Sequence, residues 1–145
     1  MMAKVLQGLE DAMRALNERL AQIKDLAAEG VRDTGLAVLS QAVRDAPVAT
    51  GELRRSGHME WAGGGEIASG QADGSVSVRD SGVPEGQDDP AVIISFTAPH
   101  AVKQHEGVEY GHPKGGKAKY LQDAALSIAQ QLPAAVAAKV GEALR

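Results

Sequence analysis

The sequence contains no cysteine, which excludes a disulfide scaffold, a thiolate zinc site and a cysteine nucleophile. Aromatic residues are also scarce, with one Trp, two Tyr and one Phe among 145 residues. Aromatic side chains supply much of the buried area in most cores, and here alanine accounts for 25 of the apolar residues. We therefore expect one domain with a thin core. Because a partner surface often supplements such a core, the composition favours an oligomer.

Long apolar runs and an excess of basic residues are absent as well. No run approaches the roughly 20 apolar residues that cross a bilayer, and the charged N-terminal segment is unlike a signal peptide. Lys and Arg number 15 against 19 Asp and Glu, which gives a net charge of −4. A dedicated nucleic-acid binder needs the opposite balance to displace counterions from phosphate. The sequence predicts no membrane partner and no sequence-specific nucleic-acid binding.

A helical pattern extends from Ala3 to Ala46. Its apolar residues are mostly three or four apart, as one face of a helix requires: Val5, Leu9, Ala12, Leu16, Leu20, Ile23, Ala27, Val31 and Val38. Gly30 and Gly35 weaken the second half, so we expect a bend or break between Ala28 and Thr34. An unbroken helix would span roughly 65 Å, whereas a compact domain of this size has a radius of gyration of about 15 Å. Either the helix folds back, or part of it projects and packs on another subunit.

The rest of the chain predicts an α+β fold with a small, mostly antiparallel sheet. Strand patterns occur at 58–62, 75–79 and 91–97, and a glycine-rich stretch at 63–90 predicts flexible hairpin loops. A second helical pattern covers 117–145 and is interrupted by Pro133, where the helix should kink, or stop and restart with proline in its first turn. We expect one domain, 1–145, with a helical segment at 1–46, strands and loops at 47–116, and the C-terminal helix at 117–145.

Three histidines, His100, His105 and His112, lie close together with Glu106 and Glu109. Imidazole and carboxylate ligands suit zinc, iron or manganese. However, the spacing places His100 and His105 on different faces of a helix or strand, and H-E-x-x-H is absent. Hydrogen bonds to loop carbonyls and neighbouring subunits are the favoured interpretation, and a small metal-dependent hydrolase is the alternative. Neither a G-x-S-x-G motif nor a complete phosphate loop is present, so we expect no catalysis and no cofactor.

A basic cluster comprises Arg54, Arg55, Lys114, Lys117 and Lys119. In an acidic protein these side chains are expected to pair with Asp or Glu of the same or a neighbouring subunit. Such pairs add little stability when exposed, but charge complementarity can set the register of an interface.

Four motifs occur in a characteristic order. They are residues 46–56 (APVATGELRRS), 96–101 (FTAPHA), 105–106 (HE) and 112–121 (HPKGGKAKYL). In order and spacing they resemble the tail-completion or neck proteins of long-tailed bacteriophages, also called head–tail joining or minor capsid proteins. The motifs cover Ala46–Ala125, and the layout of elements is similar over the whole chain. His100 departs from the family's usual Tyr, and the long loop at 63–90 is a second departure.

The resemblance implies a long N-terminal helix on a small sheet, a C-terminal helix, and a homo-oligomeric ring in the virion at the head–tail junction, assembled in the host cytoplasm. Implied partners are the connector or head-closure protein above and the tail-terminator or tail-tube protein below, with passive contact to DNA in the channel. It implies no enzymatic activity. The candidate contact residues are Arg54, Arg55, His105, Glu106, His112, Lys119 and Tyr120. Core packing is an equally good interpretation for Leu53, Phe96, Tyr120 and Leu121. The rival within the same junction is a tail terminator or head-closure protein.

Overall fold

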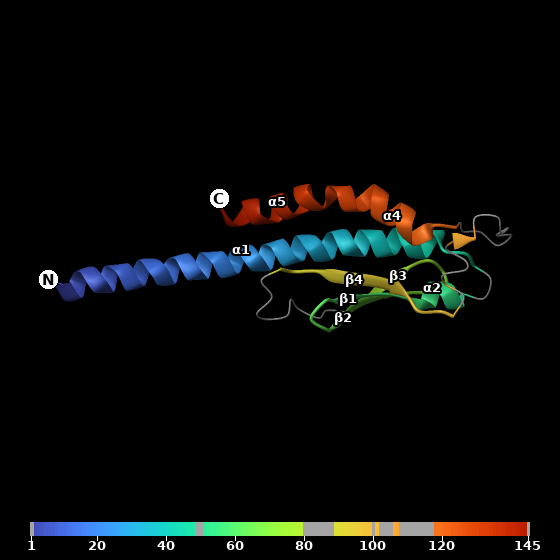
Figure 1. The fold of residues 1–145 in the computed structure, drawn as a ribbon, viewed down its shortest axis with the longest axis horizontal. Helices are drawn as coiled ribbons and strands as arrows, with labels where there is room; N and C mark the ends of the chain where they lie inside the picture. The colour runs from blue at the N-terminus through green and yellow to red at the C-terminus, as the bar shows by residue number, and fades with distance from the viewer. Residues whose placement is uncertain are drawn as a thin grey trace.

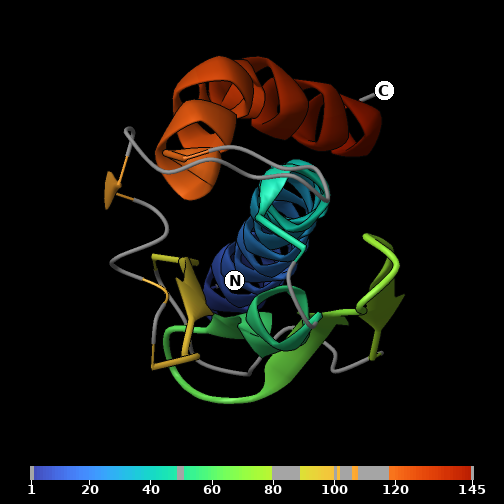
Figure 2. The ribbon, with the colours of Figure 1, turned by 90° about the vertical axis from the view of Figure 1, so that its right-hand side faces the viewer.

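One long helix organises the structure. The computed structural model describes residues 2–48, 51–79, 89–99, 101, 106–107 and 118–144. Helix α1 (Met2–Asp45) lies between two layers. A four-stranded sheet covers one side of its C-terminal half, and α4 (Tyr120–Ile128) and α5 (Leu132–Ala143) cover the opposite side (Figures 1 and 2). The α+β fold expected from the sequence is confirmed.

Helix α1 continues through Gly30 and Gly35, so of the bend or break expected between Ala28 and Thr34, the break is not present. Both glycines lie at close contacts. A Cβ at Gly30 would lie 3.0 Å from the Cα of Val136, and one at Gly35 would lie 2.7 Å from the sulfur of Met59. Packing from both layers therefore holds the helix where its intrinsic propensity is low.

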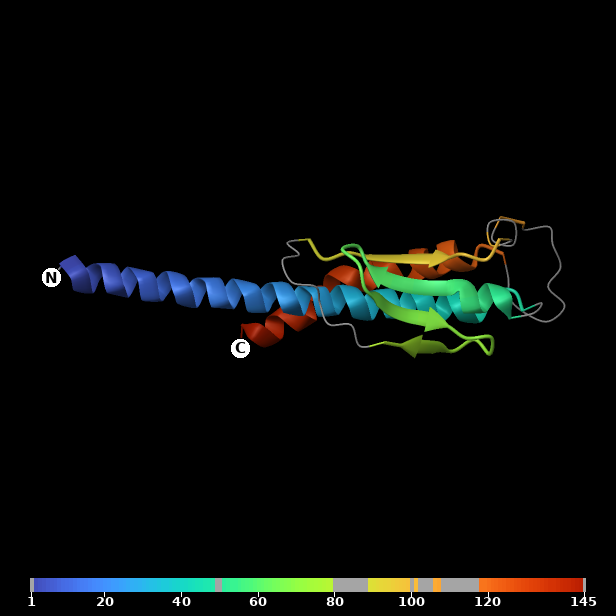
Figure 3. The same cartoon turned by 90° about the horizontal axis from the view of Figure 1, so that it is seen from below.

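The N-terminal half of α1 projects from the rest of the molecule. Every described side chain from 3 to 22 is exposed, and Figure 3 shows this part of the helix extending past the sheet and past the end of α5. Twenty residues of helix correspond to about 30 Å. The helix therefore does not fold back, and the projection that the sequence left open is observed; packing of this segment on another subunit stays a prediction.

The sheet has the order β3-β2-β1-β4 and is antiparallel throughout the described strands. Its strands are β1 (Gly57–Trp61), β2 (Glu66–Gly70), β3 (Val76–Val78) and β4 (Val92–Phe96). Strand β1 is central and pairs His58 with Ser69 of β2 and with Ser95 of β4. Three strands coincide with the predicted patterns.

Strand β2 corrects one part of the prediction for 63–90, where flexible hairpin loops were expected outside the strand at 75–79. It contains a single large apolar residue, Ile67, and is preceded by three glycines, so its own sequence has little strand character. It is fixed instead by its neighbours, since β1 and β3 pair with it on its two edges. Ile67 and Ala68 are fully buried.

The core lies around the C-terminal half of α1. Toward the sheet, Leu39 and Val43 of α1 pack with buried sheet residues that include Met59, Trp61 and Ile67. Toward the helical layer, Val38 and Ala42 pack with Ala124 of α4. The same helix thus contributes to two clusters on opposite sides.

The C-terminal helix is broken near Pro133, as the sequence predicts. Helix α4 ends at Ile128, a 3₁₀ turn follows at Ala129–Gln131, and α5 starts at Leu132 with Pro133 in its first turn. Lys139 of α5 lies 3.9 Å from a carboxylate oxygen of Glu29 and 3.7 Å from one of Asp33. Two ion pairs and the close contact at Gly30 thus lie between α5 and α1.

Candidate interface surfaces

The first surface lies at the C-terminal end of α1, where Pro47 prevents the helix from continuing. After the turn the chain forms the short helix α2 (Glu52–Ser56). Gly51 precedes it with φ of 82°, a left-handed conformation that favours glycine. Leu53 of α2 is buried, as expected, and packs with Ala46.

The Arg54 side chain turns toward the C-terminal end of α1, where it contacts backbone carbonyls. Its guanidinium donates to the carbonyl of Arg44 at 2.6 Å and to that of Ala46 at 3.1 Å, with a longer contact of 3.5 Å to Ala72. The carbonyls at the end of a helix lack partners within the helix, and a cation there also interacts favourably with the helix dipole. The Arg54 side chain therefore caps the C-terminus of α1. Arg55 is exposed on α2.

Tyr120 also belongs to the interior rather than to an exposed contact surface. It is 1% exposed, and its hydroxyl donates to the carbonyl of Ala101 at 3.0 Å. Its ring packs edge-on against Phe96, with ring centres 4.9 Å apart. Burial raises the pKa of the Tyr120 hydroxyl to about 12. Core packing, the second interpretation given from the sequence, describes its environment.

Residues from three of the four motifs meet around Tyr120. We call this group the motif cluster: Ala46, Leu53, Phe96, Ala98, Ala101, Tyr120 and Leu121. The fold thus joins segments that are up to 75 positions apart, from Ala46 to Leu121. A hollow of about 280 Å³ lies beside the cluster, lined in part by Ile94, Glu106 and Leu121. This volume is just below the usual range for small-molecule sites.

Lys119 and Glu106 form an ion pair at the rim of this hollow. Their side chains are 31% and 54% exposed, so both reach the surface. Lys119 adopts a left-handed backbone conformation with φ of 57° immediately before α4. The ion pair with Glu106 links the fourth motif to the third. Of the candidate contact residues, Arg55, Glu106 and Lys119 lie at the surface on this end of the molecule.

His105 and His112, the remaining two candidates, lie outside the described residues, as does His100 of the alternative metal site. Across 2–48, 51–79, 89–99, 101, 106–107 and 118–144, no three His, Asp or Glu side chains group as metal ligands would. In the same ranges, none of the helices has the length and apolarity of a membrane span.

His58 forms a contact that the sequence did not reveal. In the neutral tautomer its Nδ1 donates to the carbonyl of Ser56, at 3.1 Å, and its Nε2 accepts from the hydroxyl of Ser95, at 2.9 Å. Ser95 lies opposite His58 across the β1–β4 pair. Because both ring nitrogens have partners in the same chain, we assign the pair a structural role in holding β4 to β1. Thirty-seven positions separate the two residues, so no local motif could have identified them.

The second surface is an apolar stripe on the projecting half of α1. We call it the N-terminal stripe: Leu6, Leu9, Met13, Leu16 and Leu20. Each of these side chains is 47–59% exposed. Their spacing alternates between three and four residues, which is the spacing of a coiled-coil seam over two heptads. The sequence alone did not single out this seam, because Val5 and Ala12 fit a broader helical face equally well.

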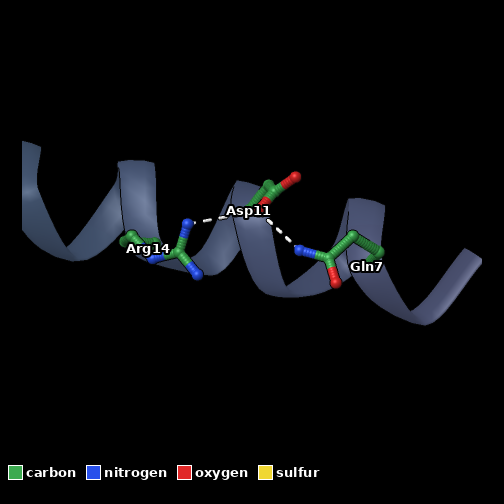
Figure 4. Close-up of polar contacts among 3 residues, drawn as sticks. All are labelled: Gln7, Asp11 and Arg14. Carbon is green, nitrogen blue, oxygen red and sulfur yellow. Dashed lines mark hydrogen bonds and ion pairs between the residues drawn. The ribbon is translucent and has the colours of Figure 1, made fainter. Parts of the chain in front are cut away.

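The opposite side of the same segment is polar. Asp11 accepts hydrogen bonds from Gln7 and Arg14, both at 3.2 Å, along the back of the helix (Figure 4). Pairs of this kind stabilise a helix only slightly, so they do not account for an isolated projecting segment. The arrangement is that of an amphipathic helix whose apolar side has no cover from the described part of its own chain.

No protein-family model, curated protein or solved structure matches this chain. The two surfaces, one at each end of α1, are therefore the basis for a functional proposal.

Proposed function

We propose that this protein is a structural subunit of a phage virion, which forms a ring at the head–tail junction and joins the connector to the tail. It acts by forming interfaces and not by catalysis. It assembles in the host cytoplasm and remains in the virion.

The N-terminal stripe is the observation that carries the proposal. In a monomer in water, five large apolar side chains on one side of a projecting helix would remain about half exposed. Contiguous apolar patches of several hundred Å² mark interaction surfaces in soluble proteins. A helix of this kind is stabilised mainly by burial of its apolar face. Assembly supplies that burial, and the thin core of the monomer favours it further.

The assignment to the phage neck rests on the order and spacing of the four motifs. The motif cluster supports it, because residues of those motifs form one packed unit and not scattered positions. Arg55, Glu106 and Lys119 lie at the surface beside this unit and are the proposed contacts with the protein above or below. His105 and His112 are the further proposed contacts from the sequence.

A ring requires heterologous contacts, in which two different surfaces of each subunit meet and the rotation between neighbours closes. The protein has candidate surfaces at both ends of α1, which suits this geometry. DNA contact with such an acidic subunit would be passive, through the inner wall of the channel and without sequence recognition.

Light scattering on the purified protein tests the proposal. The mass is measured across a range of concentrations, for the protein alone and mixed with connector and tail proteins of the same phage. A discrete closed oligomer, or a monomer that assembles only with those partners, is the expected result. A stable monomer that ignores all of them would overturn the proposal.

Metal analysis of the same samples addresses the alternative hydrolase. The hydrolase would be supported if the wild-type protein contained stoichiometric metal and had hydrolytic activity, and if His105→Ala lost both while its assembly was unchanged. For the ring subunit we expect His105→Ala to affect assembly or nothing.

A further inference from the structure

The N-terminal stripe continues a face of α1 that the protein already covers with a helix. The series Leu16, Leu20, Ile23, Ala27 and Gly30 keeps the same alternation of three and four residues, so these side chains stay on one side of α1. At Gly30 this side contacts Val136 of α5. Helix α5 ends at Ala143, and Figure 1 shows its C-terminal end above the middle of α1. Beyond that point none of the described residues covers the same face, and every side chain from 3 to 22 is exposed.

A second apolar surface lies on the exposed side of α5. We call it the outer face: Pro133, Ala134, Ala137, Ala138 and Leu144. From Leu132 to Leu144, Lys139 and Glu142 are the two ionisable residues, and Lys139 is paired with α1. An apolar face of a surface helix normally packs against another element, with charged residues on the opposite face. However, α1 covers one side of α5, and Leu144 on the outer face is 66% exposed.

We propose that the N-terminal stripe of one copy of this chain packs against the outer face of α5 in a second copy. The contact repeats, between subunits, the α1–α5 packing that exists within each subunit. Large side chains of the stripe would insert between the small residues of the outer face, which allow two helices to approach closely. One heterologous contact then covers both apolar surfaces, and this is the type of contact from which rings are built.

Pairing of two stripes with each other is less favourable on two grounds. In a parallel pair, the residues flanking the seam would place Arg19 of one helix near Lys24 of the other, and like charges repel there. In an antiparallel pair the contact would be isologous and complete with two copies. Either arrangement would leave the outer face of α5 exposed.

The area involved is adequate for association only when the contact is repeated or supplemented. A stable interface buries about 800 Å² on each partner, and the half-exposed stripe offers several hundred. In a closed ring every subunit makes the contact twice, once with each surface. Ring closure therefore supplies the additional buried area that a single pair of subunits lacks.

Paired charge substitutions test the stripe. Leu9→Glu with Leu16→Glu places two carboxylates in the proposed contact, whereas Gln7→Glu with Ala15→Glu adds the same charge on the other side of the helix. The stripe variant should associate about 100-fold more weakly than the wild type, because a carboxylate buried without a partner is costly. The control variant should associate as the wild type does. All four positions lie in the exposed segment, so circular dichroism should show both variants folded.

Equal association of the stripe variant and the wild type would overturn the proposal. So would a stripe defect that appears only in mixtures with connector or tail proteins, since the occupant would then be a different chain.

Cysteine cross-linking identifies the surface that the stripe contacts. The chain has no native cysteine, so introduced thiols are the only ones. Leu9→Cys and Leu16→Cys proteins are each mixed with Ala134→Cys or Ala137→Cys protein and treated with a short bis-maleimide. We expect heterodimers across the two positions, with at least a tenfold higher yield than for Gln7→Cys in the same mixtures.

Predominant cross-linking between two stripe positions would overturn the proposal in favour of self-pairing, and yields equal to those of Gln7→Cys would overturn it as well. The inference rests on the ring assembly proposed above, but the two can fail separately. A closed oligomer without the cross-link removes this contact and leaves the ring, whereas absence of any assembly removes both.

Discussion

The two halves of α1 have similar apolar spacing but opposite surroundings. In the C-terminal half, Leu39 and Val43 have no exposed surface, whereas Leu9 and Leu16 in the N-terminal half are 56% and 59% exposed. One continuous helix carries both. The spacing of apolar residues therefore determines that a helix forms and which side is apolar. Whether that side is covered within the chain depends on the position of the other elements, because the sheet and α5 reach only the C-terminal half.

The largest difference between the halves should appear on truncation of matched leucines. Leu39→Ala removes a fully buried side chain and should lower the free energy of unfolding by about 2–5 kcal/mol, since a cavity remains. Leu16→Ala should change it by less than about 0.5 kcal/mol in a dilute, unassembled sample. Urea denaturation below the concentration of association measures both. A similar loss for the two variants would mean that the projecting half is covered within the monomer.

Local patterns in the sequence predict some elements of this fold and miss others. Helix α1, three of the four strands and the break near Pro133 followed from apolar spacing, strand-rich runs and the chemistry of proline. Strand β2 did not, because its burial comes from pairing with two neighbours and its own residues are small. A break near Gly30, one of the two forms expected there, does not occur; glycine at this position instead permits close contact with another helix.

The candidate contact residues also differ in how well the sequence predicts their surroundings. The sequence identifies Arg54 and Tyr120 as notable but cannot give their direction, since both are fixed by groups distant in the chain. Arg54 faces carbonyls eight to eighteen positions away, and the Tyr120 hydroxyl bonds a carbonyl nineteen positions away. Arg55, Glu106 and Lys119, whose side chains reach the surface, agree with the simpler expectation for charged residues.

A smaller effect, confined to the covered end of the molecule, should follow from the pKa of Tyr120. The hydroxyl titrates near pH 10 in the unfolded chain and near 12 in the folded protein. The unfolded state thus loses its proton first. The stabilising contribution is full below pH 10 and declines as the pH rises from 10 to 12, by at most about 2–3 kcal/mol.

Tyr120→Phe isolates this contribution. The variant should be about 1 kcal/mol less stable at neutral pH, because the hydrogen bond to Ala101 is lost. Its stability should fall less steeply than that of the wild type above pH 10. Denaturation curves of both proteins at a series of alkaline pH values supply the comparison. Parallel pH profiles would mean that the Tyr120 hydroxyl is not buried in solution.

The smallest expected effect on stability comes from replacing one glycine by alanine in each half of α1. A Cβ at Gly35 would lie 2.7 Å from the Met59 sulfur and 2.8 Å from a methyl carbon of Val92, whereas a Cβ at Gly8 would meet nothing within 4 Å. Alanine gains up to about 1 kcal/mol over glycine in a helix, but overpacking costs about 1–3 kcal/mol. Gly35→Ala should therefore destabilise the protein by about 1 kcal/mol. Gly8→Ala should instead increase helix content and slow amide exchange in the projecting segment.

Circular dichroism and hydrogen exchange on the two variants measure these opposite changes in stability. The cost at Gly35 depends on the sheet that faces it, so Met59→Ala, which removes the nearer contact, should reduce the penalty of Gly35→Ala in the double variant. No such coupling is expected between Gly8→Ala and Met59→Ala. If Gly35→Ala also increased stability, close packing would not be the reason for glycine in the covered half. The difference between the halves would then lie only in exposure, and not in how tightly each residue of α1 is matched to a neighbour.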